Sequence, residues 1–305
     1  MTLVGVVGAG IMGAGVAQSL AQSGHAVRLV DISADALRTA LDSIELNCRM
    51  SRMLGGPAVD AGEVLDRITT GTDLELLADT EVVIENITED EALKRDLYPR
   101  LDRICQPGCV LVANTSAIPI TRIASWTGRP AQVAGVHFMN PVPMKPAVEF
   151  IPGHHTSPEA QRTVRELLES MGKKPIDVND ACGFISNRIS HVFMNEAAYL
   201  VYEGVASAET IDEVFRSCFG HPMGPLQTLD LIGVDTVLQS IEVLYQHFAD
   251  SKYRPCPLLK QMVDAGLLGR KSGEGFYRHG PDSRGPADSA GRNGHLTAVR
   301  SATDH

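Results

Sequence analysis

Short apolar runs alternate with longer amphipathic stretches over residues 1–181, and this alternation is the main structural signal in the sequence. Apolar runs of this length are typical of strands in a parallel sheet that is buried on both faces. Strands that alternate with helices predict an α/β fold. The predicted strands are Leu3–Val7, Ala26–Val30, Val82–Ile84, Cys109–Ala113, Val133–Val136, Ala147–Ile151 and, at the sheet edge, Lys174–Val178.

Apolar residues at helical spacing lie between these runs and predict helices. The first helix has Ile11, Val16 and Leu20 on one inward stripe and stops at Gly24. Ser33 can cap a second helix, which we expect to run to about Leu54. Its inward positions are Leu37, Leu41, Ile44 and Cys48, and a later helix has Leu93, Leu97, Leu101 and Ile104 at helical spacing.

After Asp180 the strand pattern ends and only helical patterns follow. We therefore predict an α/β domain over residues 1–181 and an all-α domain over residues 182–279, joined by a short hinge near Ala181–Gly183. Residues 280–305 have little apolar content and predict a disordered tail. The predicted helices of the second domain are Phe184–Val205, Ala208–Phe219, Gln227–Phe248 and Pro257–Ala265.

Composition narrows the class of protein. A chain of 305 residues that is 44% hydrophobic and 21% charged can bury two cores, so we expect a soluble globular protein. The formal charge of −10 argues against a nucleic-acid or anionic-membrane partner, because both favour a basic surface. No apolar run approaches the ~20 residues of a membrane span, and no signal-peptide pattern precedes the first strand.

The cysteines are scattered and lack the paired spacing of a metal site, so we predict no bound metal. Reduced thiols are the expected state, and this indicates a cytoplasmic protein. The six positions are Cys48, Cys105, Cys109, Cys182, Cys218 and Cys256.

A glycine-rich turn, G-x-G-x-x-G, stands between the first strand and the first helix. Gly8, Gly10 and Gly13 permit a tight turn and let backbone N–H groups, those of Ile11 and Met12 among them, approach a pyrophosphate at the helix N-terminus. The alternative is a glycine-rich turn that binds no dinucleotide and is followed by an incidental aspartate. The pattern alone is weak, and its position between a strand and a helix strengthens it.

Asp31 ends the second strand, about 20 residues after the glycines. A carboxylate at this point can hydrogen-bond the 2′-hydroxyl of a ribose and would repel a 2′-phosphate. The next residue is Ile32 rather than an arginine, so NAD is favoured over NADP. The first domain is therefore predicted to be a doubly wound, Rossmann-type NAD-binding domain.

Ser116 follows the strand that ends at Ala113. Polar residues at the C-terminal ends of parallel strands line the crevice where open α/β sheets bind ligands, so Ser116 is a candidate for contacting a substrate oxygen. It can equally cap the helix near Pro119, and position alone leaves both roles open.

His137 and Glu149 flank a proline-bent turn between two predicted strands. The second strand can return the carboxylate to the imidazole, an arrangement that orients a general base and keeps it in one tautomer. A lone histidine at a strand end is more often a structural hydrogen-bonding residue, so both roles stay open from this stretch alone.

Six motifs occur together between Leu3 and Tyr277, in an order that is highly specific. They are Gly8–Gly13, Asn114–Ser116, His137–Glu149, Gly183–Arg188, Pro222–Pro225 and Gly269–Tyr277. With them the chain resembles the 3-hydroxyacyl-CoA dehydrogenase family. The resemblance implies an NAD-dependent oxidoreductase of acyl thioesters.

The resemblance also implies the roles of individual residues. His137 would be the general base that removes the 3-hydroxyl proton as hydride leaves C3 for the nicotinamide, and Glu149 would hold and polarise its imidazole. Ser116 and Asn187 would hydrogen-bond the substrate oxygen. Because Asn187 belongs to the second domain, domain closure would complete the site.

Further NAD contacts and a homodimer follow from the same resemblance. Apolar positions of the second domain exceed what one thin layer can bury, which also favours a dimer through that domain. The implied NAD contacts are Glu89, Lys94, Asn140 and Lys271, and the apolar positions are Val192, Phe193, Leu200 and Val201.

Several positions depart from the family pattern. Family members commonly have phenylalanine at Met139, proline at Cys182 and alanine at Asn86. The helical arm that contacts CoA is usually rich in lysine, whereas this chain offers Arg49 and Arg52. A CoA phosphate favours more positive charge, so an acyl carrier protein is a second predicted carrier.

Two stretches, His137–Pro146 and Ser217–Pro225, also resemble a branch of the family found in polyketide pathways. That resemblance implies oxidation of a glyceryl or similar hydroxyacyl group on an acyl carrier protein, on the way to hydroxy- or methoxymalonyl extender units. The alternative prediction is therefore the same chemistry on a different carrier.

Two other functions remain as alternatives. The 6-phosphogluconate-like 3-hydroxyacid dehydrogenases use a lysine on the long helix, where this chain has Asn187 and Arg188, and they leave His137 and Glu149 unexplained. A non-catalytic NAD-binding scaffold would have no need of the intact set Ser116, His137, Glu149 and Asn187.

Overall fold

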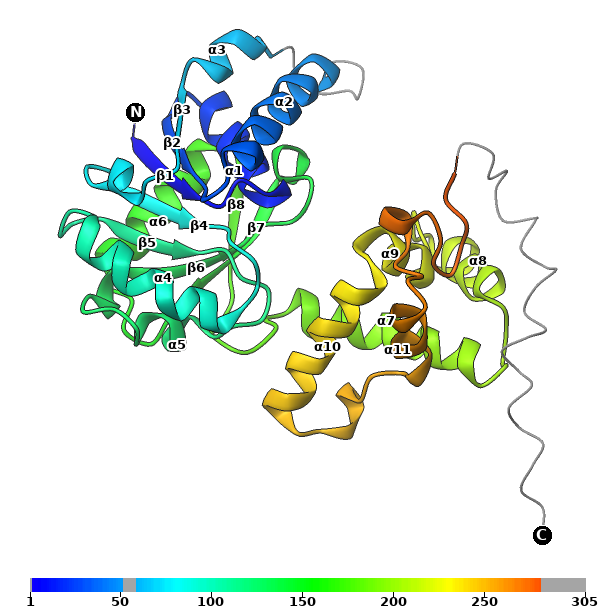
Figure 1. The fold of residues 1–305 in the computed structure, drawn as a ribbon. Helices are drawn as coiled ribbons and strands as arrows, with labels where there is room; N and C mark the ends of the chain where they lie inside the picture. Colours follow the sequence, from blue (N-terminus) through cyan, green and yellow to red (C-terminus); the bar gives the residue numbers. More distant parts are fainter. Residues whose placement is uncertain (1, 52–58, 281–305) are drawn as a thin grey trace. The chain divides into compact units, whose positions relative to one another are not determined.

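The computed structural model describes residues 2–51 and 59–280. Two compact units divide the chain between Phe184 and Ile185. Figure 1 shows strands and helices in the first unit and helices in the second. The predicted all-helical character of the second domain and the α/β character of the first are confirmed.

An eight-stranded sheet forms the centre of the N-terminal unit, with strand order β3-β2-β1-β4-β5-β6-β7-β8. Every neighbouring pair is parallel except β6 and β7, which are antiparallel. The order reverses direction at β1, as in doubly wound sheets. The strands are β1 Leu3–Val7, β2 Ala26–Val30, β3 Ile68–Gly71, β4 Val82–Glu85, β5 Val110–Ala113, β6 Val133–His137, β7 Ala147–Pro152 and β8 Lys174–Asp177.

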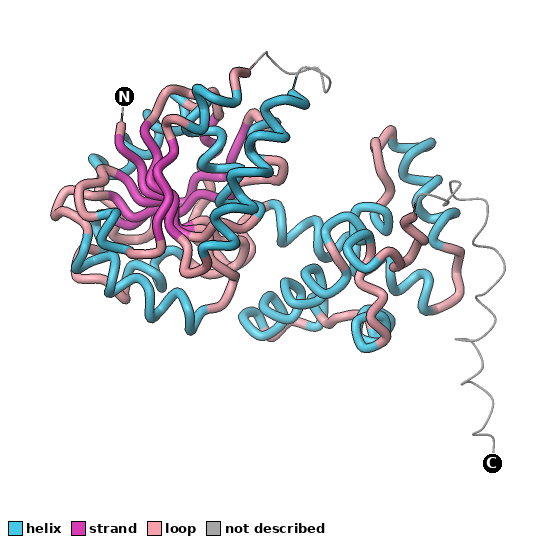
Figure 2. Tube along the Cα trace, turned by 45° about the horizontal axis from the view of Figure 1, so that its top comes forward, coloured by secondary structure: helices cyan, strands magenta, loops and turns pink. Residues whose placement is uncertain are grey.

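Helices cover both faces of this sheet (Figure 2). Alternate residues of one strand point into different cores: Val82 and Ile84 belong to one apolar cluster and Val83 to the other. This is why the strands appear in the sequence as continuous apolar runs. One face is covered by α1 Ile11–Gln22, α2 Ala34–Ser51, α3 Ala61–Leu65 and α6 Pro158–Ser170, and the other by η2 Leu74–Leu77, α4 Glu91–Ile104 and α5 Ile120–Ala124.

Two expectations about the helices of this unit need correction. Ile11 is 77% exposed, so it is not on the inward stripe of α1, which consists of residues such as Val16 and Leu20. In the same helical turn Ala14 is buried in the core, so only the outward position of Ile11 departs from the predicted stripe. The helix predicted to reach Leu54 is described only as far as Ser51, and the remainder lies outside the described residues.

The C-terminal unit is built from five α-helices within the described residues. They surround an apolar core to which Leu226, Leu229, Val237 and Ile241 contribute. The helices are α7 Ser186–Tyr202, α8 Ala208–Phe219, α9 Pro225–Ile232, α10 Val234–Phe248 and α11 Pro257–Asp264, with 3-10 turns η5 Ser251–Tyr253 and η6 Arg270–Ser272.

The prediction of one helix over Gln227–Phe248 is wrong. The structure divides this stretch into α9 and α10 at Gly233, whose φ is +110°. A left-handed backbone ends a right-handed helix, and glycine tolerates it. The helix predicted from Phe184 begins instead at Ser186, because Gly183 and Phe184 have φ values of +74° and +47°.

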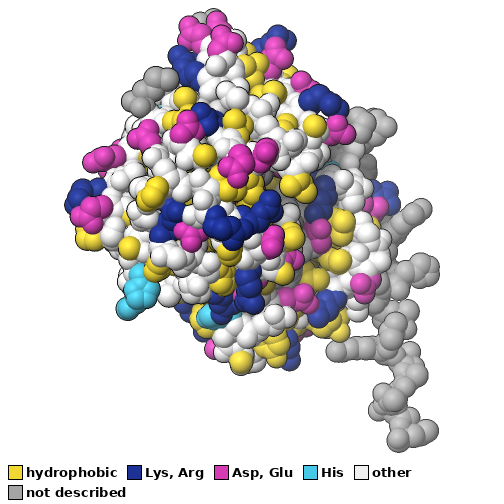
Figure 3. Space-filling view, turned by 60° about the vertical axis from the view of Figure 1, so that its left-hand side comes forward, with side chains coloured by type: hydrophobic (Ala, Val, Ile, Leu, Met, Phe, Trp, Pro, Cys, Tyr) yellow, Lys and Arg dark blue, Asp and Glu magenta, His cyan; other side chains and the backbone are white. Residues whose placement is uncertain are grey.

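Charged side chains of both signs are interspersed on the face shown in Figure 3. Many form ion pairs at the surface, such as Arg95 with Glu91 at 2.7 Å on α4. Among residues 2–51 and 59–280, no helix is both long and apolar enough to cross a membrane. Of the predicted disordered tail, residues 281–305 lie outside the described part of the chain.

Candidate active site

The glycine turn joins β1 to α1, and its three glycines have different surroundings. Gly8 has φ +95° and donates its N–H to the carbonyl of Val30 at 2.8 Å. A Cβ on Gly13 would lie 1.7 Å from the carbonyl oxygen of Gly8, whereas a Cβ on Gly10 would meet nothing within 4 Å. Packing of α1 on the turn therefore requires Gly13, and Gly10 borders space that a ligand can enter.

The start of α1 and the end of β2 form the remainder of this site. No side chain caps the N-terminus of α1, so the amide groups around Ile11 and Met12 keep their positive dipole for an anion. At the end of β2, Asp31 accepts the N–H of Ala9 at 2.7 Å, which holds its carboxylate beside the glycine turn. The adjacent Ile32 is 97% exposed. This combination fits the pyrophosphate and ribose of NAD.

His137 and Glu149 lie directly opposite each other in the antiparallel pair of β6 and β7. Nδ1 of His137 is 2.7 Å from Oε2 of Glu149, and both residues are buried. An ionised carboxylate only accepts hydrogen bonds, so the ring proton resides on Nδ1 and the basic lone pair on Nε2. The ring of Phe184 packs 6.0 Å from that of His137, centroid to centroid.

Ser116 lies on the other side of the imidazole. Its Oγ is 3.1 Å from Nε2 of His137, and the hydroxyl donates to that nitrogen. The alternative role, capping of α5, belongs to Asp180, which accepts the N–H groups of Ile120 at 2.8 Å and Thr121 at 2.7 Å. The three side chains Ser116, His137 and Glu149 thus form one continuous hydrogen-bonded chain.

Lys173 holds the turn between the two strands of this pair. Its ammonium donates to the carbonyls of Val142 at 2.7 Å and Lys145 at 3.0 Å. Burial lowers the pKa of Lys173. The turn contains η4 Val142–Met144 and a cis peptide bond between Asn140 and Pro141. Asn140, a predicted NAD contact, is exposed on it.

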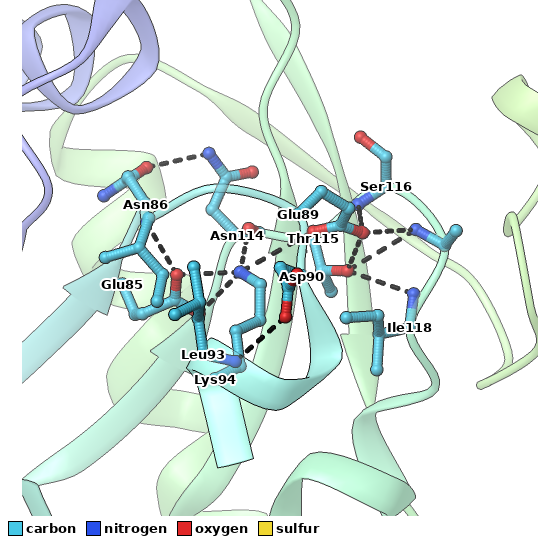
Figure 4. Close-up of polar contacts among 12 residues, drawn as sticks. Glu85, Asn86, Glu89, Asp90, Leu93, Lys94, Asn114, Thr115, Ser116 and Ile118 are labelled. Carbon is cyan, nitrogen blue, oxygen red and sulfur yellow. Dashed lines mark hydrogen bonds and ion pairs between the residues drawn. The ribbon is translucent and has the colours of Figure 1, made fainter. Parts of the chain in front are cut away.

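Figure 4 shows a second polar cluster beside Ser116. Lys94 reaches from α4 to the carboxylate of Glu85 at 2.7 and 2.8 Å, and its ammonium is 3.6 Å from Glu89. Glu89 in turn accepts the backbone N–H of Ser116 at 2.9 Å. The side chain of Lys94 is fully buried, so its ammonium faces the protein interior in the described structure.

The sequence did not predict roles for three residues of this region, which are Glu85, Asn114 and Lys173. Glu85 could have been recognised as a candidate, because it is a carboxylate at the end of the otherwise apolar strand Val82–Glu85. Asn86, where the family commonly has alanine, accepts from the amide of Asn114 at 2.8 Å, and Asn114 accepts the N–H of Phe138 at 3.2 Å. The departure at Asn86 thus braces the segment after His137.

Two predicted site residues belong to the C-terminal unit. Asn187 is on the first turn of α7, and its carbonyl oxygen lies 3.1 Å from Nδ1 of His191. Lys271 forms an ion pair with Asp235, with Nζ 2.6 Å from Oδ2. In the part of the chain that the structure describes, no group of three or more His, Cys, Asp or Glu side chains could hold a metal ion.

Two protein-family models match nearly all of the described residues. Residues 3–181 match the family described as 3-hydroxyacyl-CoA dehydrogenase, NAD binding domain, and residues 183–279 match the corresponding C-terminal domain. The chain belongs to the 3-hydroxyacyl-CoA dehydrogenase family. The family resemblance and the NAD cofactor predicted from the sequence are thereby confirmed.

Individual members of the 3-hydroxyacyl-CoA dehydrogenase family are similar along nearly their full length. A probable 3-hydroxybutyryl-CoA dehydrogenase of Deinococcus radiodurans is 49% identical over 281 residues, which cover 90% of this chain and 99% of the relative. A probable 3-hydroxybutyryl-CoA dehydrogenase of Bacillus subtilis is 47% identical, with 89% and 95% coverage. The crystal structure of (S)-3-hydroxybutyryl-CoA dehydrogenase from Ralstonia eutropha has a TM-score of 0.85 at 41% identity, covering 92% of this chain and 99% of that one.

Proposed function

We propose that this dehydrogenase oxidises the 3-hydroxyl group of a 3-hydroxyacyl-CoA thioester and that 3-hydroxybutyryl-CoA is its substrate. The observation that carries the proposal is the hydrogen-bonded chain Glu149–His137–Ser116, which leaves the basic nitrogen Nε2 of His137 next to a hydroxyl group. The substrate class is supported by the names of the relatives in Deinococcus radiodurans and Bacillus subtilis.

In the proposed mechanism, His137 accepts the proton of the substrate 3-hydroxyl on Nε2. Glu149 keeps the proton of Nδ1 in place and stabilises the imidazolium that forms. The Ser116 hydroxyl, next to Nε2, donates a hydrogen bond to the substrate oxygen and orients it. NAD, when bound, supplies the acceptor for the hydride that leaves C3.

The cofactor contacts are proposals of the same kind. We assign the pyrophosphate to the amides after Gly8, Gly10 and Gly13 and the adenosine ribose to Asp31, because α1 lacks a cap and the carboxylate is already oriented there. Glu89 is 32% exposed and Asn140 is exposed, so both can reach a cofactor on this edge of the sheet. Lys271, a residue of the C-terminal unit, is also assigned a contact with NAD.

We assign substrate binding and dimerisation to the helical domain, residues 182–279. Asn187 is assigned a side-chain hydrogen bond to the substrate oxygen. Exposed apolar side chains on this unit, Val205 at 65% and Phe219 at 67%, support a homodimer. Val192, Phe193, Leu200 and Val201, from which the dimer was predicted, are only half-buried. Sedimentation at low protein concentration tests this, and a monomer would contradict it.

An acyl carrier protein is the second candidate carrier. Arg49, one of two basic residues predicted on the CoA-binding arm, is bound to Glu45 at 2.5 Å, so its charge is already matched within α2. Arg52 lies outside the described residues. Glyceryl-acyl carrier protein and 3-hydroxybutyryl-CoA should be offered in parallel with NAD. Faster turnover of the CoA ester supports the main proposal, and faster turnover of the carrier-protein ester replaces it.

A cytoplasmic location is proposed on the state of the cysteines. In the part of the chain that the structure describes, the six cysteines are present as thiols rather than disulfides, and five of them are buried. Fractionation of the source cells, followed by immunodetection of the chain, tests this proposal. Recovery outside the cytoplasm would contradict it.

The direct test of the proposed function follows NADH absorbance with 3-hydroxybutyryl-CoA and NAD. We expect turnover by the unaltered protein and a loss of about 10²–10⁴-fold in His137→Ala, the usual contribution of a general base. His155→Ala, which changes an exposed histidine, serves as the control. Equal rates in His137→Ala and the unaltered protein would reject the mechanism, and NADH binding without turnover of any 3-hydroxyacyl thioester would favour a non-catalytic scaffold.

A further inference from the structure

A buried ammonium group joins three segments next to the catalytic serine (Figure 4). Lys94 donates to both carboxylate oxygens of Glu85, at 2.7 and 2.8 Å, and lies 3.4 Å from the carbonyl oxygen of Asn114. Its third neighbour is Glu89, at 3.6 Å. The end of β4, the segment before α4 and the end of β5 therefore meet at one positive charge.

The inner half of this cluster is closed to solvent. Glu85 and Lys94 have 1% and 0% of their side chains exposed. The remaining acceptor capacity of Glu85 is filled by the N–H of Ile87 at 2.7 Å and the hydroxyl of Tyr98 at 3.2 Å. A buried carboxylate with this many donors is fixed in one position. Its partner Lys94 is fixed with it.

The outer half of the cluster holds the turn that carries Ser116. One oxygen of Glu89 accepts the backbone N–H groups of Ser116 at 2.9 Å and Ala117 at 3.0 Å, and also the hydroxyl of Thr115. Its other oxygen faces Lys94. The position of Glu89 thus sets the backbone from which the Ser116 hydroxyl reaches His137.

We infer that Lys94 and Glu85 are positioning residues, which set the Ser116 hydroxyl opposite Nε2 of His137 through Glu89. This assignment rests on the proposed function, and it concerns the turn that carries Ser116 rather than the NAD contact predicted for Lys94. Complete burial of the ammonium and its three protein partners support a positioning role. The chain of contacts is continuous from Tyr98 in the core to Ser116 at the catalytic histidine.

A double-mutant cycle tests the inference with Lys94→Met, Ser116→Ala and the combined variant. Loss of the Ser116 hydrogen bond to a charged transition state is expected to lower kcat about 10- to 100-fold. If Lys94 acts through Ser116, Lys94→Met lowers kcat to a similar degree but adds less than about 3-fold in the Ser116→Ala background. Lys260→Met, at a surface lysine paired with Glu242, is the matched control and should leave kcat unchanged.

The same experiment separates the competing roles. A loss in Lys94→Met that is undiminished in the Ser116→Ala background would overturn the inference. If Lys94→Met does not fold, Glu85→Gln takes its place, because it retains the size and an acceptor oxygen, and the same criteria apply.

A measurement made without substrate tests this inference independently of the proposed function. The ¹⁵N chemical shift of Nε2 in His137 reports the hydrogen bond from Ser116, and the resonance can be assigned with His137→Gln. Lys94→Met should move this shift in the same direction as Ser116→Ala. An unmoved shift would overturn the inference even if 3-hydroxybutyryl-CoA proves to be a substrate, and a moved shift would support it even if it does not.

Discussion

His137 and Glu149 are paired residues of one antiparallel ladder, and Nδ1 of the imidazole lies 2.7 Å from Oε2 of the carboxylate. The strand register places both side chains on the same face of the sheet. A shift of the register by one residue would turn one of them to the opposite face. The β6–β7 turn, which Lys173 holds through two carbonyl groups, therefore sets the register that brings the imidazole and the carboxylate together.

Replacement of Glu149 by glutamine should impair catalysis more than folding. The amide can donate to Nδ1 and so favour the wrong tautomer of His137, and it cannot stabilise an imidazolium as a carboxylate does. We expect kcat to fall by about 10²–10⁴-fold, the range for loss of general-base function. Steady-state NADH formation measures this, with Glu159→Gln on the exposed face of α6 as the control. A loss of less than about 3-fold would contradict the assigned role.

Alanine at Gly10 and at Gly13 should produce different defects. Nothing lies within 4 Å of a Cβ at Gly10, so Gly10→Ala should fold with an unchanged melting temperature and lose affinity for NADH. A Cβ at Gly13 would collide with the carbonyl of Gly8, so Gly13→Ala should be destabilised before any ligand is added. Melting curves and NADH titrations measure the two effects. Equal stability of both variants would show that α1 is not packed on the turn as described.

Asp31 should determine the choice between NAD and NADP. Asp31→Ser removes a charged hydrogen bond to the ribose, worth about 1.5–3 kcal/mol, which corresponds to about 10- to 100-fold in kcat/KM for NAD. It also removes repulsion of a 2′-phosphate, so kcat/KM for NADP should rise. Asp35→Ser, an exposed carboxylate on α2, is the control. Unchanged discrimination between the cofactors would place the adenosine ribose elsewhere.

Glu85 should contribute a measurable pH dependence to stability. Burial raises the pKa of Glu85, and the ammonium of Lys94 opposes this rise. The folded state then holds the proton to higher pH than the unfolded state, so the contribution of Glu85 to stability is complete below its unfolded pKa and is lost as pH rises through the folded pKa. The free energy of unfolding of the unaltered protein, measured relative to Glu85→Gln, should therefore fall as pH rises above about 4.5. Urea unfolding at several pH values measures it.

The comparison needs a control for general effects of charge. Exposed Glu166, replaced by glutamine, should show no such trend relative to the unaltered protein over the same pH range. A stability difference between the unaltered protein and Glu85→Gln that increases with pH would mean that the Lys94 ion pair outweighs the effect of burial.

Tyr277 should stabilise the C-terminal unit through Asp212. Its hydroxyl donates to the buried carboxylate of Asp212 at 2.7 Å, and burial, followed by that hydrogen bond, raises the pKa of Tyr277. Tyr277→Phe should lower the free energy of unfolding by about 1–3 kcal/mol. Because the folded pKa is raised, this difference should be complete below about pH 10 and shrink above it. Urea unfolding measures it, with Tyr245→Phe as the control; equal effects of the two variants would contradict a specific role.

Local patterns in the sequence predicted three elements to the residue and most of the other strands to within one residue at an end. The bounds of β1, β2 and α8 are those expected from their apolar periodicity. Buried strands need continuous apolar runs and amphipathic helices need a repeating stripe, so these elements are visible without any knowledge of their partners. The break at Gly233 was not visible, because the apolar pattern continues across it and only the backbone conformation ends the helix.

The position of Ser116 could not be decided in this way. Sequence offered two roles for it, a helix cap and a hydrogen bond to substrate. Asp180, which lies 60 residues from Ile120, takes the capping role and leaves Ser116 next to His137. A competitor so distant in the chain is not part of any local pattern.

The sequence by itself determined the doubly wound sheet, the helical second domain, the family and its cofactor, because period and motif spacing are local properties of the chain. Only the tertiary structure decided which polar residues interact with each other. Lys94 is buried in an ion pair with Glu85, and Glu89 accepts the backbone N–H of Ser116. Hydrogen bonds and ion pairs depend on which side chains meet after the strands are ordered in the sheet. That order brings together residues whose separation in sequence carries no signal.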